Sequence, residues 1–410
     1  MIHIEKTQVV IIGAGPSGSI AAALLKNNNI DSIVIEKSLF PRFSIGESLL
    51  PACMEVMKKA NLLEAVEKAN FQLKTGAAFH CDGRSSKFDF SQKFTAGIGQ
   101  TYQVQRGTFD KVLADEATCQ GADIRYQHEL VNINLDNTPE LTVANKAGEQ
   151  YKIEAEFVLD ASGFARVLPR LLDLELPSEL SPRKAIFTHI EDHICDAAFD
   201  RNKILISIHP GDKEVWYWLI PFSNGTCSVG VVAKESFLEK YPMDNMQALQ
   251  QLLNEESGLK RILKNAVYHQ DANAILGYSA NVKTLCDDKF ALLGNAGEFL
   301  DPVFSSGVTI AMKSAELATD VLVKKFSGET VDWEEYYAKP LMVGVDAFRC
   351  YVEGWYSGKF QEVILTPKPN KKVKQMLSSI LAGYAWDESN PFVSEPYRRL
   401  ETVFQLCSDQ

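Results

Sequence analysis

The hydrophobic pattern of the first forty residues predicts alternating strands and helices. Residues 8–12 are a run rich in β-branched side chains, residues 19–25 have the small and apolar side chains of a buried helix, and residues 32–35 form a second such run. Short β-branched runs bounded by turn residues are typical of buried strands. The order strand, helix, strand predicts a βαβ unit within a parallel sheet.

Further along the chain the pattern changes from buried runs to alternation. Residues 204–208 and 227–232 alternate in a way that is typical of strands in an antiparallel sheet. Buried strand-like runs appear at 157–160 and 291–293. Since these two buried runs flank the alternating segment, we expect the first domain to be discontinuous and the antiparallel sheet to be inserted into it.

Domain boundaries follow from these changes of pattern. A single hydrophobic core seldom grows beyond about 250–300 residues, so 410 residues are expected to form two joined domains and a terminal extension. After residue 330 the pattern is helical, and its aromatic side chains either pack in a core or line a pocket for an aromatic substrate. The predicted segments are 1–75, 100–170 and 280–330 for the first domain, 76–99 and 171–279 for the β-sheet substrate domain, and 331–410 for the C-terminal helices.

Composition and charge exclude several classes of function. The chain is 46% hydrophobic and 23% charged, as in ordinary globular proteins, and its net charge of −11 disfavours nucleic acid as a partner. No apolar stretch is long enough to span a bilayer, and strand-like residues begin almost at Met1, so we expect no signal peptide, no membrane span and a cytoplasmic location. The eight cysteines are scattered without a C-x-x-C pair, which predicts neither a zinc site nor a disulfide framework.

A glycine-rich turn between the first strand and the helix predicts a dinucleotide site. In its G-x-G-x-x-G pattern, Gly13 permits the tight turn, Gly15 lets the backbone approach a pyrophosphate, and Gly18 lets the helix pack against the strand. The helix N-terminus then faces the phosphates. Glu36 ends the second strand, where an acidic side chain accepts hydrogen bonds from ribose hydroxyls. This fingerprint alone does not distinguish FAD from NAD.

Three later segments favour FAD. Residues 291–297, with Asn295 where aspartate is usual, resemble the segment by which glutathione-reductase-type flavoproteins hold the flavin ribitol. Asp160 and Arg106 lie in segments that resemble, respectively, the strand returning to the nucleotide domain and the R-x-x-F-D-x-x-L segment of the same flavoproteins. The resemblance implies an α/β fold (α+β overall) with a glutathione-reductase-type FAD-binding domain, an inserted antiparallel-sheet substrate domain and C-terminal helices.

Two tryptophans narrow the class of flavoprotein. Period-2 spacing places Trp216 and Trp218 on one face of a strand, where such side chains ordinarily pack in the core of a sheet. The sequence from Trp216 to Pro221 reproduces the motif W-x-W-x-I-P completely, and together with the glycine fingerprint it resembles flavin-dependent halogenases. In that family the motif is regarded as filling the space near the flavin, so that organic substrates are not hydroxylated directly.

Two further segments extend this resemblance. Residues 40–51 resemble the family's P-R-x-x-x-G-E-S-x-x-P flavin strap, with Arg42, Glu47 and Ser48 in the motif. Lys74 matches the position of the family's active-site lysine, whereas an isolated lysine is ordinarily a solvated surface group. A buried amine can hydrogen-bond hypohalous acid or form a haloamine, which makes the halogen electrophilic.

Residues 299–308 predict a helix N-terminus that faces the flavin. Free backbone N–H groups there can hold an anion, and the resemblance places a halide near the amides of Ser306 and Gly307. Tryptophan-specific halogenases have a catalytic glutamate immediately before the first serine, Ser305, whereas this chain has Phe304. Free tryptophan is therefore a poor candidate for the substrate, and the chain resembles instead the halogenases of phenols and of pyrroles tethered to carrier proteins.

The predicted site thus has three groups of residues and no metal. The catalytic candidates are Lys74, Trp216, Trp218 and Ser305. The candidates for contact with FAD are Gly13, Gly15, Pro16, Ser17, Gly18, Glu36, Lys37, Arg42, Glu47, Ser48, Arg106, Asp160, Asn295, Pro302, Gly307 and Val308. The halide candidates are Ser306 and Gly307.

The resemblance implies an FAD-dependent halogenase. Reduced FAD from a separate flavin reductase and O₂ would oxidise chloride or bromide to hypohalous acid, which an electron-rich phenol or pyrrole, free or bound to a carrier protein, would attack. Two alternatives remain open: an FAD-dependent aromatic monooxygenase or reductase on the same fold, and a non-catalytic flavin-binding protein. A monooxygenase would form product without halide, and a binding protein would turn nothing over.

Overall fold

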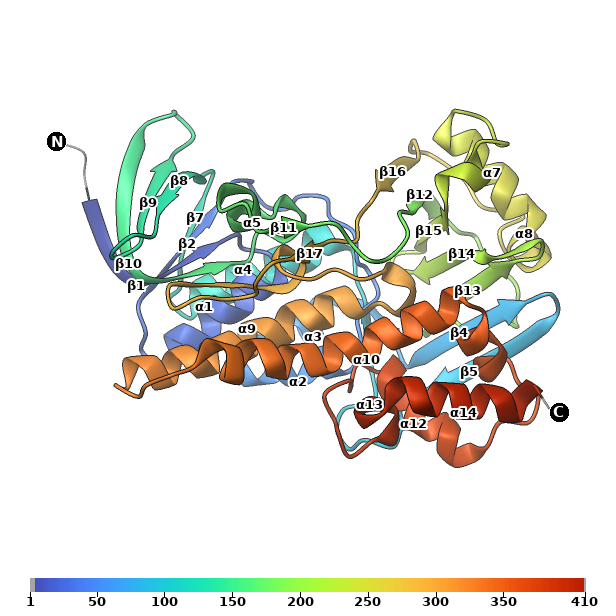
Figure 1. Ribbon diagram of the computed structural model, residues 1–410. Helices are drawn as coiled ribbons and strands as arrows, with labels where there is room; N and C mark the ends of the chain where they lie inside the picture. The colour runs from blue at the N-terminus through green and yellow to red at the C-terminus, as the bar shows by residue number, and fades with distance from the viewer. Residues whose placement is uncertain (1–3, 409–410) are drawn as a thin grey trace.

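The first sheet of the computed structural model, which describes residues 4–408, is built around the predicted βαβ unit (Figure 1). Residues 1–3 and 409–410, at the ends of two predicted segments, lie outside the described residues. The strands in spatial order are β7 (Asp123–Tyr126), β2 (Ser32–Glu36), β1 (Ile4–Ile12), β10 (Gln150–Asp160), β9 (Glu140–Ala144) and β8 (Glu129–Asn134), with β18 (Phe290–Leu292) also paired to β10.

Both faces of the central strand β1 are buried. Val9 and Ile11 pack in the core on one face, and Val10 and Ile12 pack in a second core on the other. Strand β1 is parallel to β2 and to β10, which is in turn parallel to β18. A parallel strand covered on both sides has the continuous apolar sequence that residues 9–12 show.

The second sheet is antiparallel except at one pair of strands. Its order is β16 (Asn273–Leu276), β12 (Lys184–Glu191), β15 (Thr226–Ala233), β14 (Asp212–Pro221), β13 (Lys203–His209), β4 (Gly76–Cys81) and β5 (Arg84–Asp89). The pair β13–β4 is parallel, which differs from a wholly antiparallel sheet. The hairpin β4–β5 comes from an earlier part of the chain, so no tight turn forces β4 to run opposite to β13. The predicted fold class is confirmed.

Two small sheets and the helices complete the fold. The small sheets pair β3 (Gln72–Lys74) with β6 (Thr101–Gln103) and β11 (Glu175–Leu176) with β17 (Asn281–Val282). The helices are α1 (Pro16–Asn27), α2 (Ala52–Lys59), α3 (Leu63–Lys68), α4 (Arg106–Cys119), α5 (Val167–Leu171), α6 (Glu235–Leu238), α7 (Asn245–Glu255), α8 (Ser257–Ile262), α9 (Ser306–Phe326), α10 (Lys339–Tyr356), α11 (Lys359–Ile364), α12 (Lys371–Leu381), α13 (Pro391–Ser394) and α14 (Pro396–Ser408).

One continuous core joins the two sheets. It contains side chains of β1, of α1, α9 and α10, and of the inner face of β14, so the C-terminal helices share a core with the nucleotide-binding unit. Figure 1 shows α10 running along the lower side of the molecule from the first sheet toward the second. Among residues 4–408, no helix is long and apolar enough to cross a membrane, and no cluster of three His, Cys, Asp or Glu side chains could hold a metal ion.

Candidate active site

A cavity of about 660 Å³ lies between the first sheet and the inner face of the second. Most of the residues predicted to form the site line this cavity, although they come from five separate segments of the chain. The predicted residues in its lining are Gly13, Gly15, Pro16, Ser17, Glu36, Lys37, Arg42, Glu47, Ser48, Arg106, Trp216, Trp218, Asn295, Pro302, Ser305, Gly307 and Val308. Four predicted residues, Gly18, Lys74, Asp160 and Ser306, are not part of that lining.

The three glycines of the fingerprint have three different surroundings. Gly13 has a φ of +98°, and a Cβ there would lie 2.7 Å from the carbonyl oxygen of Ala161. A Cβ on Gly18 would lie 1.9 Å from the carbonyl oxygen of Gly13, so helix α1 packs directly on the turn. A Cβ on Gly15 would meet only the end of the Arg42 side chain, at 3.5 Å. Gly15 therefore faces the cavity, while the other two hold the turn together.

Two buried carboxylates hold the turns that follow β1 and β10. Glu36 accepts a hydrogen bond from the backbone N–H of Ala14 at 2.9 Å and still lines the cavity. Asp160 accepts hydrogen bonds from the N–H groups of Ser162 and Leu168 at 2.9 and 2.7 Å and is fully buried. Both oxygens of Asp160 bind backbone, so this carboxylate shapes the turn and is not part of the cavity lining; its contact with the cofactor stays a prediction.

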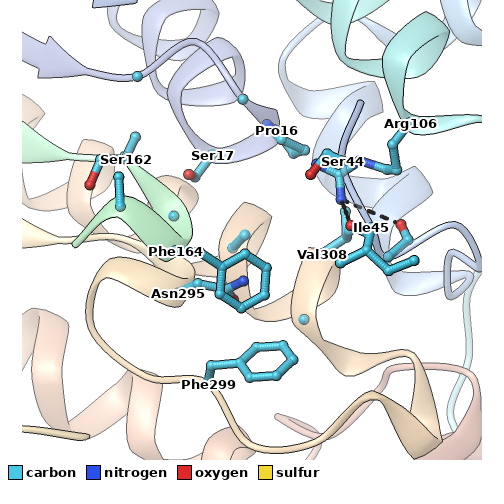
Figure 2. Close-up of a pocket in the computed structure, with 18 of the residues that line it drawn as sticks. Pro16, Ser17, Ser44, Ile45, Arg106, Ser162, Phe164, Asn295, Phe299 and Val308 are labelled. Carbon is cyan, nitrogen blue, oxygen red and sulfur yellow. Dashed lines mark hydrogen bonds between the residues drawn. The ribbon is translucent and has the colours of Figure 1, made fainter. Parts of the chain in front are cut away.

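Two arginines fix the first half of the strap, residues 40–51. Arg106, at the start of α4, forms a two-point ion pair with Asp110 and donates to the carbonyl oxygens of Ile45 and Gly46 (Figure 2). Arg42 of the strap lies 3.2 Å from the same carboxylate. Paired arginine and carboxylate groups carry directional hydrogen bonds, so the strap is fixed to α4 at both of these residues.

The second half of the strap is extended and has side chains on two sides. Ser48 pairs with Gln103 of β6, and an extended backbone directs successive side chains to opposite faces. The Glu47 carboxylate lies 2.6 Å from Nε2 of His189 on β12. The Ser48 hydroxyl accepts a hydrogen bond from Nζ of Lys74 at 2.7 Å. The Glu47–His189 pair and the Ser48–Lys74 pair thus lie on opposite sides of the strap.

Lys74 ends strand β3 and is almost completely buried, with 1% of its surface exposed. Its Nζ donates to the Ser48 hydroxyl and to the Leu49 carbonyl oxygen, both at 2.7 Å, and lies 5.5 Å from the centre of the Phe90 ring. Burial lowers the pKa of Lys74 from 10.5 to about 7. The amine is therefore about half neutral near pH 7, and only Ser48 of these partners also lines the cavity.

A buried thiol lies close to the lysine. Cys53, at the start of α2, is completely buried, and its Sγ lies 3.1 Å from the hydroxyl oxygen of Thr309 on α9. Burial raises the pKa of the Cys53 thiol, although the hydrogen bond from Thr309 and the charge of Lys74 oppose this rise. Cys53 thus contacts α9, the helix that begins with the halide candidates Ser306 and Gly307.

The N-terminus of α9 opens toward the cavity. Ser305 precedes it with φ +58° and ψ 24°, a left-handed conformation that is uncommon outside glycine, and no side chain caps the helix. Ser305, Gly307 and Val308 line the cavity, whereas Ser306 is buried behind it. The side-chain oxygen of Asn295 is buried without a hydrogen-bond partner among the described residues. Free donors and an unpaired acceptor therefore lie at this end of the cavity.

Trp216 and Trp218 project from one face of β14, as the period-2 spacing predicts, and both line the cavity. Their ring centres are 6.0 Å apart and their planes are tilted by 46°. The Trp218 indole N–H donates to the Ser228 hydroxyl at 3.0 Å, and its ring lies across Gly230 of β15. The indole can lie flat on the neighbouring strand because residue 230 has no side chain.

Replacing Gly230 by Ala is expected to displace the Trp218 ring. A Cβ at residue 230 would lie 2.3 Å from the indole, and such overpacking costs about 1–3 kcal/mol of unfolding free energy. We expect a changed near-ultraviolet circular dichroism spectrum and a lower denaturation midpoint. Gly211→Ala is the control, because a Cβ there would come no closer than 3.3 Å to its neighbour. An unchanged spectrum and midpoint for Gly230→Ala would contradict the packing described.

A hydrogen-bond chain that the sequence analysis did not find joins β14 to the turn that precedes Ser305 and the predicted halide site. The Trp216 indole N–H donates to the Tyr356 hydroxyl of α10 at 3.0 Å, and this hydroxyl donates to the Asp301 carboxylate at 2.8 Å. The other oxygen of Asp301 accepts from the N–H of Val303 at 3.0 Å and so caps the single turn before Ser305. Nothing in the sequence spacing indicates this chain, because its members come from three distant segments.

Two aromatic residues at the cavity were also missed. Phe164 and Phe299 form an edge-to-face pair with ring centres 5.2 Å apart, and Figure 2 shows both rings close to Asn295. Phe164 is 40% exposed, which is unusual for a large apolar side chain. Phe164 lies in a 3₁₀ helix of three residues and Phe299 in an isolated β-bridge, and segments this short have no periodicity that distinguishes the two residues from loop aromatics.

The unpaired groups of the cavity fit FAD. The N-terminus of α1, with Gly15 at its cap and no capping side chain, lies in the lining, as a pyrophosphate site requires. The Asn295 oxygen and one oxygen of Glu47 are buried without partners among residues 4–408, and both could accept hydrogen bonds from a bound cofactor. The donors and acceptors of FAD would satisfy these groups.

Comparisons with known proteins identify the family of this chain. The family model of the FAD binding domain matches residues 6–334. A 1H-pyrrole-2-carbonyl-(peptidyl-carrier protein) chlorinase of Pseudomonas fluorescens is 31% identical over 77% of this chain and 75% of its own. A crystal structure of a flavoprotein/dehydrogenase from Cytophaga hutchinsonii is 40% identical, with a TM-score of 0.95 over 98% of this chain and 99% of its own. The flavin-dependent brominase Bmp2 is 25% identical, with a TM-score of 0.83 over 99% of this chain and 100% of its own. The chain therefore belongs to the FAD binding domain family and, within it, to the flavin-dependent halogenases.

Proposed function

We propose that this flavin-dependent halogenase transfers chlorine or bromine from hypohalous acid to an electron-rich aromatic compound. The observation that carries the proposal is the Lys74 amine, which is buried, has a pKa of about 7 and is held against the strap by Ser48. An amine that is half neutral near pH 7 can donate a hydrogen bond to hypohalous acid or accept its halogen as a nucleophile. Either role makes the halogen available to an aromatic ring.

The remaining residues would confine the oxidant. Bound reduced FAD, supplied by a separate flavin reductase, would provide with O₂ the oxidising power that converts halide to hypohalous acid. The amides of Ser306 and Gly307 would hold the halide at the uncapped start of α9. Trp216 and Trp218 would fill the cavity between the flavin and the second sheet, so that an organic substrate cannot reach the flavin. Lys74 would receive the oxidant on the far side of Ser48.

The proposed substrate is a phenol or a pyrrole, free or attached to a carrier protein. The Pseudomonas relative is named for a pyrrole on a peptidyl carrier protein. Phe304, where tryptophan-specific halogenases have glutamate, lies 5.8 Å from the Trp355 ring and 5.4 Å from the Phe360 ring. This apolar cluster offers no carboxylate to an indole nitrogen, which supports a substrate other than free tryptophan.

The deciding experiment is mass spectrometry of reactions with a flavin reductase, FAD, O₂ and either halide. The aromatic panel contains phenols and pyrroles, each free and loaded on a carrier protein, together with free tryptophan. We expect halogenated product only when halide is present. Oxygenated product in halide-free reactions would overturn the proposal in favour of a monooxygenase. Reduction of an alkene or carbonyl without halide would favour a reductase, the activity class nearest to the description of the Cytophaga structure.

Replacing Tyr356 by Phe is expected to raise the halide concentration needed for half-maximal rate. The change leaves the Trp216 N–H and the Asp301 carboxylate without their shared partner, and a buried group that loses its partner costs about 1–3 kcal/mol. The control is Tyr351→Phe, on the same helix, where the hydroxyl donates to the Phe392 carbonyl away from the cavity. Both variants should lose stability. If both needed the same halide concentration for half-maximal rate, the hydrogen-bond chain from Trp216 through Tyr356 to Asp301 would have no role in holding the halide.

A further inference from the structure

Glu47 has an unpaired oxygen at the wall of the cavity, and the hydrogen bonds of the strap do not explain this feature. The side chain is 2% exposed, it lines the cavity, and its Oε2 is buried without a hydrogen-bond partner among the described residues. Its Oε1 lies 2.6 Å from Nε2 of His189. The carboxylate thus has one oxygen without a protein partner and the other held by an imidazole.

His189 extends this contact away from the cavity. It lies near the end of β12, on the same face as Ala185 and Phe187, which line the cavity, but is not itself part of the lining. Its side chain is 22% exposed, whereas that of Glu47 is 1% exposed. The pair therefore runs from a buried carboxylate oxygen to an imidazole that water can reach.

The charges around His189 favour its protonated form. Burial lowers the pKa of His189, but the hydrogen bond and charge of Glu47 outweigh this and raise the pKa above 6.5. The other charged neighbours are already paired: Glu191, on the same strand, lies 3.3 Å from both His193 and His269, and Arg201, held at the Phe222 carbonyl, pairs with Asp192. The partner of His189 in β15, Ser228, is uncharged.

The proposed reaction consumes protons in the cavity. Forming hypohalous acid from halide obeys X⁻ + O₂ + 2e⁻ + 3H⁺ → HOX + H₂O, and reduced FAD in its anionic form, FADH⁻, brings two electrons and only one of these protons. The other two must come from solvent. A titratable pair within hydrogen-bond distance is the ordinary protein device for such a transfer.

We propose that Glu47 and His189 form the proton path between solvent and the flavin cavity. The imidazolium of His189 gives its proton to the Glu47 carboxylate, the carboxyl group rotates so that its O–H points toward the cavity and releases that proton there, and water protonates the imidazole again. This inference rests on the proposed function for the identity of the reaction but not for the path itself, since oxidation of anionic reduced FAD by O₂ also takes up a proton (FADH⁻ + O₂ + H⁺ → FAD + H₂O₂).

The test uses the holoenzyme and three variants. His189→Gln keeps a polar group near Glu47 but cannot titrate, His189→Ala leaves space for added imidazole, and Glu47→Gln removes the charge. The control is His193→Gln, an exposed histidine that pairs with Glu191 outside the cavity. We measure product formation and FAD oxidation from pH 6 to 9, the affinity for FAD, and the pKa of His189 by NMR in oxidised holoenzyme.

The path predicts four results. His189→Gln lowers the rate of product formation roughly 10²-fold and removes the fall of this rate at alkaline pH. Added imidazole restores the rate of His189→Ala, and Glu47→Gln lowers the pKa of His189 measured by NMR. His193→Gln changes neither the rate, nor its pH profile, nor the pKa of His189. A pH profile of His189→Gln like that of the wild type would overturn the path, and so would a failure of imidazole to restore the rate of His189→Ala. The path would also be overturned if the variants lost rate only in proportion to their loss of affinity for FAD. If the wild type makes no halogenated product, the proposed function fails, and the path is judged on FAD oxidation and the NMR titration.

Discussion

Lys74→Met is expected to lower halogenation roughly 10²- to 10⁴-fold while FAD still binds. Methionine is apolar and of similar length, so it fits the buried position, but it has no amine to hold or accept the halogen. Because Lys74 does not line the cavity, the affinity for FAD should stay within about twofold. Halogenated product and FAD affinity are measured on the same preparations.

A second lysine gives the matched control. Lys93 is partly buried, is not part of the cavity lining, donates to the Gly97 carbonyl oxygen at 2.6 Å and lies 4.9 Å from the centre of the Tyr384 ring. Lys93→Met should retain activity. Equal activity of Lys74→Met and wild type would refute the role of the amine, and equal loss in both variants would indicate a general effect of burying methionine.

Lys74→Met also tests the pKa of Lys74, through the pH dependence of the free energy of unfolding. Between about pH 7 and 10.5 the unfolded chain binds more protons at this residue than the folded chain, so the free energy of unfolding rises with pH. The slope from a single group is at most about 1.4 kcal/mol per pH unit. Denaturant unfolding from pH 7 to 9 should show this rise in wild type, whereas Lys74→Met should have a flatter dependence.

Gly18→Ala is expected to weaken FAD binding by about 100-fold. The added Cβ would lie 1.9 Å from the carbonyl oxygen of Gly13, and since the Cβ is bonded directly to the backbone of α1 and the oxygen is itself a backbone atom, the helix must move away from β1. Overpacking of this kind costs about 1–3 kcal/mol or more, and 2.7 kcal/mol corresponds to a 100-fold change in affinity. Fluorescence titration of apoprotein with FAD measures the change.

The neighbouring Gly15 distinguishes damage to the turn from intrusion into the cavity. Gly15→Ala places its methyl group in the cavity, where it meets only the end of Arg42. This variant should also bind FAD weakly, but its apoprotein should unfold at the wild-type denaturant concentration, whereas Gly18→Ala should unfold earlier. A wild-type affinity in Gly18→Ala would show that α1 can shift without changing the phosphate site.

Residues within one local motif could be predicted from the sequence, and residues brought together by tertiary folding could not. Gly13, Gly15 and Gly18 lie in one turn whose geometry is determined by the backbone, so their spacing alone predicts where they lie. By contrast, Glu47 meets His189 and Trp216 meets Tyr356 across more than a hundred residues. No periodicity records such contacts.

Asp160 shows a different limit of prediction. A carboxylate at the end of a parallel strand is a reasonable cofactor ligand, and Glu36 at the end of β2 does line the cavity. The loop after β10 instead returns two N–H groups, from Ser162 and Leu168, to the Asp160 side chain. Whether such a residue faces the ligand or the loop depends on the path of the loop, which the strand pattern does not determine.

The position of Cys53 has a consequence for the lifetime of the enzyme. Hypohalous acid reacts fastest with deprotonated thiols, so an oxidant held at Lys74, as proposed, would expose Cys53 to oxidation. Burial raises the pKa of Cys53 and keeps it a thiol, and its sulfur forms a hydrogen bond with the Thr309 hydroxyl. The same packing that lowers the pKa of the lysine thus lowers the reactivity of the thiol. Cys53, in the first turn of α2, would therefore resist oxidation by the hypohalous acid that we propose forms in the neighbouring cavity.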